Sequence, residues 1–248
     1  MKRHPLLLLA AAALLTLLPS CRFIRVSDEL KEQLKENINF DVNVDANGKS
    51  ITASSNLITR NDVTGSFHAL TCNLPADMTY TPGECALTIS GPDNILQHIV
   101  VNNESGTLII KSDGTAFRNL KNLKIALSSP VLESATFNGA VDFSAPQGIT
   151  ATDFKTTVNG AGDIGITGLK ASTASIQVNG AGDADITGID CDDLTVAISG
   201  AGDATLAGSA RKADLSISGA GDIDARSLRA EEFNTNVRGI GRIQKPKN

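Results

Sequence analysis

The sequence predicts an all-β protein folded as a parallel β-helix, or β-solenoid, with coils of about 20 residues. A glycine-rich pentapeptide recurs, with its first glycines separated by 21, 20, 20, 19 and 20 residues. Apolar and polar residues alternate on both sides of each copy, which is typical of strands with one buried face. Equivalent positions hold similar residue types, as stacking in register requires. The copies are residues 138–142, 159–163, 179–183, 199–203, 218–222 and 238–242.

Stacked coils place equivalent side chains in rows. One apolar row is expected to contain Phe137, Val158, Val178, Ile198, Ile217 and Val237. Each pentapeptide would form one corner, and a second corner is expected near Gly168, Gly188 and Gly208, because glycine tolerates positive φ and close backbone approach. The alanines of the corner, Ala140, Ala161, Ala181, Ala201 and Ala220, are expected to point inward. We expect a right-handed coil, since parallel crossovers are nearly always right-handed.

Residues 1–20 read as a signal peptide. Lys2 and Arg3 form a basic start, and residues 6–18 are almost wholly apolar but too short to span a membrane as a stable helix. The order Leu-Pro-Ser before Cys21 resembles a bacterial lipobox, which would make Cys21 the lipid attachment residue. The alternative is an ordinary signal peptide with an incidental cysteine.

Residues 21–55 are expected to be a lipid-anchored tether. A short helix is predicted over 27–35, with Ser27 as its N-cap, and a strand over 40–44. Residues 56–130 lack the repeat and are interpreted as irregular strands that cap or begin the coil. Solenoid repeats then occupy 131–244. The strands expected in the irregular part are 66–74, 78–80, 86–89, 95–101, 107–111 and 123–127.

Several segments together resemble the head GIN domain family, over about residues 56–243. They are residues 56–60, Phe67, residues 80–83, residues 106–110 and the repeated Asn/Ser-Gly-Ala-Gly-Asp. That family comprises bacterial envelope proteins of uncertain role, labelled autotransporter adhesins. The resemblance implies a β-helical fold and an exported protein, and it supplies no catalytic residues.

A row of aspartates is the most suggestive chemistry in the sequence. Its members are Asp142, Asp163, Asp183, Asp203 and Asp222. Calcium solenoids also carry aspartates at their turns, but with a nine-residue repeat and a different glycine spacing. We expect each carboxylate to accept backbone N–H groups of its own corner, with a metal row as the alternative. Arg242 takes the aspartate's place in the last repeat and is expected to lie over Asp222.

Catalytic signals are weak. His68 and His98 have no nucleophile motif nearby and are expected at the surface or an edge. The chain has no Trp and one Tyr, so it lacks the aromatic platforms of polysaccharide-cleaving β-helices. The phenylalanines of the repeat are expected to fill the core: Phe137, Phe143, Phe154 and Phe233. No cofactor is expected.

Three cysteines remain after Cys21, and an exported protein meets an oxidising compartment. Cys72 and Cys85 flank one strand-turn unit and are predicted to form a disulfide, leaving Cys191 free. The leader takes Lys2 and Arg3 with it, so 20 basic and 27 acidic residues remain, a formal net charge of −7. That charge argues against nucleic acid as a partner.

Together these features predict a non-catalytic lipoprotein of the bacterial outer membrane whose β-helical head acts as a binding or adhesion scaffold. Its expected partners are the membrane, through the lipid, and an envelope protein or glycan. Self-association and the side of the membrane are left open. Two alternatives are a polysaccharide-processing β-helix enzyme and a purely structural envelope protein.

Overall fold

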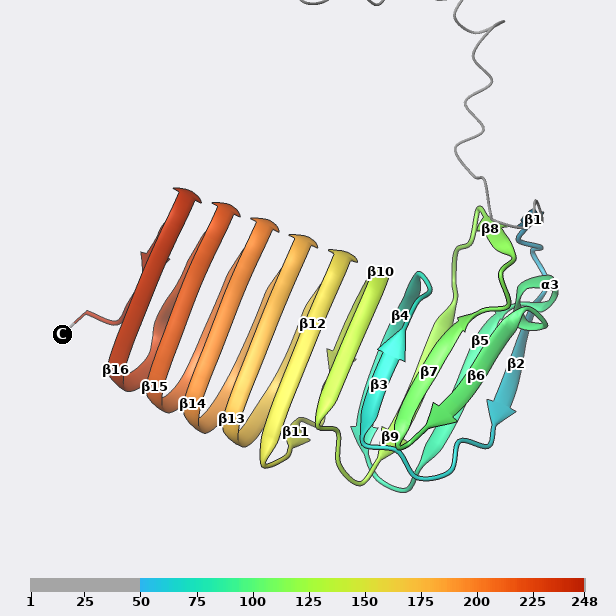
Figure 1. Cartoon of the computed structure of the whole chain (residues 1–248), viewed down its shortest axis with the longest axis horizontal. Coiled ribbons are helices and arrows are strands. Elements are labelled where there is room, and N and C mark those ends of the chain that lie inside the picture. Colours follow the sequence, from blue (N-terminus) through green and yellow to red (C-terminus); the bar gives the residue numbers. More distant parts are fainter. Residues whose placement is uncertain (1–49, 248) are drawn as a thin grey trace, which may run out of the picture. The chain divides into compact units, whose positions relative to one another are not determined.

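The computed structural model describes residues 50–247, all within one compact unit, Asn43–Asn248. The predicted signal peptide, Cys21, the short helix and the strand over 40–44 lie outside the described residues. The described chain is almost entirely β, as the repeat predicted (Figure 1).

The regular coils begin at β10, and their strands pair in parallel with the next coil along the chain. Phe137, Val158, Val178 and Ile198 are consecutive register partners, so the predicted apolar row is confirmed. Each of these four is at most 1% exposed. The strands of this part are β10 (Ser134–Ala145), β11 (Ile149–Thr150), β12 (Asp153–Ala161), β13 (Ile164–Ala181), β14 (Ala184–Ala201), β15 (Ala204–Ala220), β16 (Ile223–Ile240) and β17 (Ile243–Gln244).

The glycines of the pentapeptide corner bring successive coils into close contact. Gly180 has φ +144°, and a methyl group added to it would overlap the carbonyl oxygen of Gly160 in the previous coil. The inward orientation expected for the corner alanines is wrong, because all five are exposed. The close contact at the corner is therefore between the glycine backbones of successive coils. The alanine methyl groups face solvent.

The irregular N-terminal part contains a coil, residues 69–82, that the sequence analysis did not predict. β3 and β4 pair in parallel with β10 on one side, and with β7 and β9 on the other. Antiparallel strands then close this end, since β5 pairs with β9 and β2, and β6 pairs with β7. The elements are β1 (Ser50–Thr52), β2 (Leu57–Asp62), β3 (Ala69–Cys72), β4 (Ala76–Pro82), β5 (Ala86–Pro92), α3 (Asp93–Leu96), β6 (Ile99–Glu104), β7 (Thr107–Ser112), β8 (Ala116–Arg118) and β9 (Lys124–Ser129).

The strand predicted over 95–101 is only partly correct. The chain forms one helical turn, α3, before β6 starts at Ile99. Asp93 fixes this turn, because its Oδ1 accepts hydrogen bonds from Asn94 N (2.7 Å) and Ser54 Oγ (2.5 Å). The turn buries Ile95 and Leu96, and these contacts with residues about 40 positions away override the apolar pattern of a strand.

The two ends of the main sheet differ. Its strand order runs from β17 and β16 at one end to β5 and β2 at the other. Among the described residues, β16 is the last full coil (Figure 1). The short strand β17 covers only Ile223 and Asp224. The C-terminal mouth of the solenoid is consequently open along most of β16.

Candidate functional site

The aspartate row lies on the outside of the pentapeptide corners, and each carboxylate reaches toward the next coil. Asp163 Oδ1 accepts a hydrogen bond from Asp183 N at 2.8 Å, and Asp183 Oδ1 accepts one from Asp203 N at 2.8 Å. The same contact links Asp142 to Asp163 at 3.2 Å and Asp203 to Asp222 at 2.7 Å. The carboxylates thus cap the neighbouring coil, and the expectation that they cap their own corner is wrong.

Basic residues stand at both ends of the aspartate row. Arg242 N donates to Asp222 Oδ1 at 3.0 Å, and Arg242 Nε lies 3.1 Å from Asp222 Oδ2, so its predicted position is confirmed. At the other end the row extends to Asp77, the register partner of Asp142, and then to Lys124, the register partner of Asp77.

A second row runs beside the aspartates and was missed from the sequence. Asn138 Nδ2 donates to Asn73 Oδ1 at 2.7 Å, Asn159 to Asn138 at 2.9 Å, and Asn179 to Asn159 at 3.0 Å. The Asn73-x-x-x-Asp77 spacing matches that of the repeats and could have revealed the hidden coil. The glycines that made the other copies conspicuous are absent there.

Neither row forms a metal centre in this structure. Across residues 50–247, no group of three or more His, Cys, Asp or Glu side chains is arranged to hold a metal ion. The Oδ1 atom of each linked aspartate already accepts a hydrogen bond from a backbone N–H group. The geometry assigns the row to coil-to-coil capping.

The two described histidines lie in the irregular part, away from the aspartate row. His98 Nδ1 lies 2.9 Å from Asp113 Oδ2, and His68 Nε2 lies 3.8 Å from Glu133 Oε2. Hydrogen bonds from His98 and Thr115 lower the pKa of Asp113 to about 2. These pairs fix loops at the surface.

The predicted Cys72–Cys85 disulfide is not formed, and both thiols are free, as is Cys191. Cys72 points into the core, where its Sγ lies 3.6 Å from the carbonyl oxygen of Leu74, and burial raises its pKa to about 11. Cys85 is half-buried and lines a surface groove with His68 and Pro130. The strand alternation that buries Cys72 separates it from this groove.

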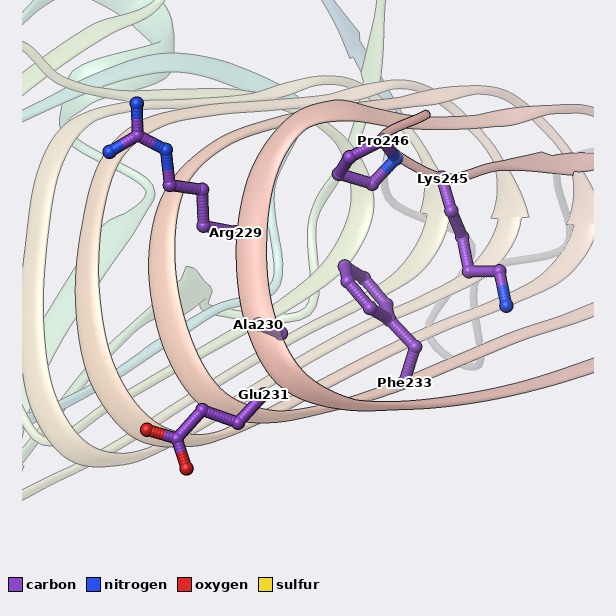
Figure 2. A pocket seen from close by; sticks show the side chains of 6 residues that line it. All are labelled: Arg229, Ala230, Glu231, Phe233, Lys245 and Pro246. Atoms are coloured by element: carbon purple, nitrogen blue, oxygen red, sulfur yellow. The ribbon is translucent and has the colours of Figure 1, made fainter. Parts of the chain in front are cut away.

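The open mouth at β16 holds a cavity of about 560 Å³ lined by Arg229, Ala230, Glu231, Phe233, Lys245 and Pro246 (Figure 2). Phe233 is half-buried at the end of the core, and Lys245 Nζ lies 5.9 Å from the centre of its ring. The other repeat phenylalanines are buried as predicted. Tyr80 is also buried, and its hydroxyl donates to Ser129 O at 3.0 Å, so it cannot act as a sugar platform. Figure 2 shows Phe233 inside the coil, whereas the side chains of Arg229 and Glu231 project outward, away from the ring.

Among the described residues, no helix has the length and apolar character needed to cross a membrane.

Comparison with known proteins identifies both the sequence family and the fold. Residues 66–245 match the sequence profile of the family described as "Putative auto-transporter adhesin, head GIN domain". A crystal structure of a "putative adhesin" from Bacteroides fragilis is 25% identical, with a TM-score of 0.65, and the match covers 79% of this chain and 99% of that one. No curated protein matches the sequence.

Two structures from Parabacteroides distasonis share the fold at lower identity. A "putative adhesin" is 17% identical with a TM-score of 0.74, covering 79% of this chain and 84% of that one. A "Putative lipid binding protein" is 18% identical with a TM-score of 0.62, covering 80% of this chain and all of that one (100%).

Proposed function

The chain belongs to the head GIN domain family described as auto-transporter adhesins, and from this premise we propose that it is a non-catalytic binding scaffold of the bacterial cell envelope. In this proposal Cys21 carries the lipid, the tether links it to the body, and the solenoid presents the binding surface. The anchor lies in the outer membrane, and the partner is an envelope protein or a glycan.

The observation that carries the proposal is the regular outer surface of the solenoid. Backbone pairing holds equivalent polar side chains in rows, as in the outward set Lys155, Ser175, Thr195, Asp214 and Asn234. Such a surface repeats at the strand spacing of about 4.8 Å, so it can contact an extended polymer at several equivalent points. Solenoid proteins use extended surfaces of this kind for binding.

Two ion pairs on the outer surface join residues that lie close together on it. Arg211 contacts Asp193 at 2.7 Å, and Lys212 contacts Asp214 at 3.2 Å. A cleft that cleaves a glycan would need an acid and a base with distinct environments, converging on one bond. These local pairs favour binding over catalysis.

The proposal is tested by comparing binding with turnover on one panel of purified envelope polysaccharides and outer-membrane extracts. The full-length protein should bind at least one component saturably while releasing neither reducing ends nor unsaturated sugars. Release of either product at a rate proportional to protein concentration would establish the enzyme alternative. Absence of binding to every component of the panel would contradict the scaffold.

A further inference from the structure

The outer edge of β16 is an unpaired strand. β16 pairs with β15 as far as Ile240, whereas β17 covers only Ile223 and Asp224 on the other side. Within residues 50–247, no strand lies against the free edge of residues 231–240. Exposed backbone N–H and C=O groups of this kind can template pairing with another strand.

The same edge exposes side chains that belong to the core in every earlier coil. Val237 is 40% exposed, whereas Ile217, its register partner in β15, is 1% exposed. Phe233 is half-buried, whereas its partner Ala213 is fully buried. The mouth therefore presents apolar surface that another coil would cover.

Residues 232–238, Glu-Phe-Asn-Thr-Asn-Val-Arg, are complementary to a second copy of themselves. In an antiparallel pair centred on Thr235, Glu232 faces Arg238 of the other copy twice, once on each side of the centre. Asn234 faces Asn236, and Phe233 faces Val237. Across the two strands, each charge thus faces the opposite charge, each amide faces an amide, and each apolar side chain faces an apolar side chain.

Other registers lack this match. Side chains alternate between the two faces of a strand. The cores of the two copies therefore lie on the same face of the joined sheet only if odd-numbered residues of one copy lie opposite odd-numbered residues of the other. Centring on Asn234 places Glu232 opposite Asn236 and leaves Phe233 opposite Thr235. Centring on Asn236 places Glu232 opposite Ile240.

The charges on the edge are available for this contact. Arg238 forms no ion pair with any residue in the described part of the chain. Glu232 is held along the strand by Asn234, whose Nδ2 lies 2.8 Å from Glu232 Oε1 and 2.8 Å from Asp214 Oδ1. Glu232 retains a second carboxylate oxygen for an arginine.

At the opposite end, β2 offers no such self-match. An antiparallel β2 pair centred on Thr59 would set Leu57 against Asn61 and Ile58 against Arg60. Arg60 is also already engaged, with its guanidinium bonded to Asp62 (2.9 Å) and to the carbonyl oxygen of Leu96 (2.7 Å). Of β16 and β2, only β16 therefore matches a second copy of itself.

We infer that two copies of this chain associate through β16, edge to edge and antiparallel, about a twofold axis at Thr235. Such an isologous contact closes at two copies and does not propagate into a fibre. It joins the two cores at their mouths, which places the N-terminal strands β1 and β2 of the copies at opposite ends of the dimer. If the scaffold proposed above is tethered at its N-terminus, this arrangement links two membrane surfaces; that role rests on the proposed function, and the dimer itself does not.

A charge-swap series tests the dimer and its register by sedimentation equilibrium of the full processed protein in mild detergent. The wild type should show a monomer–dimer equilibrium. Glu232→Arg and Arg238→Glu should each weaken it by about tenfold, because every single swap creates two like-charge pairs per dimer. The double variant Glu232→Arg/Arg238→Glu should recover the wild-type constant. Lys170→Glu, a charge change on β13 far along the sheet from the edge, serves as the control and should change nothing.

Thr235→Cys provides an independent test, because the axis places residue 235 opposite itself. Cross-strand Cβ atoms lie about 4.5–5.5 Å apart, close to disulfide distance. Mild oxidation should give a covalent dimer, while Thr205→Cys, exposed on β15, should stay monomeric under the same conditions.

Three results would overturn the inference. They are a wild type that stays monomeric at all concentrations, polymers in place of dimers, and a double swap that is not restored. Since the measurements involve neither membrane nor glycan, a failed dimer leaves the scaffold proposal standing, and failed glycan binding leaves the dimer standing.

Discussion

Thr156 is an inward residue whose chemistry does not suit its place. It is fully buried (0% exposed), and its hydroxyl has no hydrogen-bond partner among residues 50–247. Its register partner Ile176 and the next residue of that row, Val196, are apolar. The strand places a hydroxyl where the core supplies only hydrocarbon.

Thr156→Val should therefore stabilise the protein by about 1 kcal/mol, because it removes an unsatisfied buried group and conserves volume. Chemical denaturation at neutral pH would measure the change. Thr157→Val, on the outward-facing neighbour, is the matched control and should have little effect. A loss of stability in Thr156→Val would show that the hydroxyl is satisfied in solution.

In the aspartate row, repulsion between like charges opposes the stabilisation from hydrogen bonds. Neighbouring carboxylates repel at the strand spacing, while each accepts a backbone N–H group of the next coil. Asparagine keeps an acceptor oxygen and removes the repulsion, as the row Asn138, Asn159 and Asn179 already illustrates.

Asp183→Asn should thus shift Tm by no more than about 2 °C, or raise it, and millimolar calcium should leave the wild-type Tm unchanged. Asp183→Ala, which loses the acceptor, should lower Tm. Thermal melts with calcium and with chelator would check both points. A saturable rise in Tm with calcium that Asp183→Asn abolishes would turn the row into a metal site.

Two surface carboxylates should make the protein acid-sensitive. The pKa values of Asp113 and Asp224 are lowered from 3.8 to about 2, mainly by hydrogen bonds from His98 and Arg226 respectively. A carboxyl group whose pKa is lower in the folded state than in the unfolded state stabilises the fold at pH values above its unfolded-state pKa. This contribution is lost as the pH falls through the folded-state pKa. Tm should fall between about pH 4 and pH 2, and less steeply in Asp113→Asn. Identical slopes in the two proteins would exclude the Asp113 contribution.

Among the structural elements, the corner decides whether coils can stack. Three glycines distinguish the effect of backbone conformation from the effect of close contact between coils. Gly180 has positive φ and no room for a methyl group, whereas Gly139 has φ +135° but its nearest neighbour, the carbonyl carbon of Leu74, would lie 3.9 Å away. Gly165 has neither constraint, since its added Cβ would lie 3.9 Å from Phe143 O.

Substitution by alanine should destabilise in the order Gly180 > Gly139 > Gly165. Gly139→Ala should cost about 1–2 kcal/mol through its conformation, and Gly180→Ala more, because two backbones must also separate. Gly165→Ala should be neutral or slightly stabilising, since glycine is unfavourable within a strand. Equal costs at Gly180 and Gly139 would mean that contact between coils is not limiting.

The leading coil shows why this constraint eases toward the N-terminus. Leu74 and Pro75 stand where later repeats have glycine and alanine, and the corner above them, at Gly139, has room for a side chain. On the other side of this coil, β7 and β9 pair with its strands but not with residues 74–76 of the corner, so no backbone pairing there requires glycine at Leu74 or Pro75.

At the scale of the whole molecule, the solenoid has one closed end and one open end. Antiparallel strands and α3 close the N-terminal side, while the last coil leaves Val237 and Ile240 exposed, at 40% and 82%. Among the described residues, the open end therefore offers an unpaired strand edge to a partner.

Cys21→Ser should move the protein from the membrane fraction to the soluble fraction, because the proposed lipid would be its hold on the membrane. A single acyl chain binds a membrane only marginally, so stable anchoring implies several chains on this cysteine. Fractionation of cells followed by immunoblotting would show the change, with Cys191→Ser as the matched control. Unchanged membrane association of Cys21→Ser would refute the anchor.

The sequence alone determined the solenoid, its period, the buried row and the position of Arg242, because every repeat carries its own strands and corner. Parallel stacking with a period of about 20 residues then aligns like with like. The register of residues 138–240 follows the repeat except for two irregularities, between Ile186 and Ile189 and between Thr205 and Ala207. They place Gly208 opposite Ile189, so the predicted second corner does not align Gly208 with Gly188.

Only the tertiary structure decided which way the corner alanines point, which N–H each aspartate caps, and that residues 69–82 form a coil. It also decided that Cys72 is buried in the core while Cys85 lines a surface groove. Each of these depends on contacts between separate coils or on segments without a repeat, such as the 65-residue separation of Asn73 and Asn138. The open edge of β16 is likewise a property of the assembled stack, because a strand's sequence does not specify whether another coil lies above it.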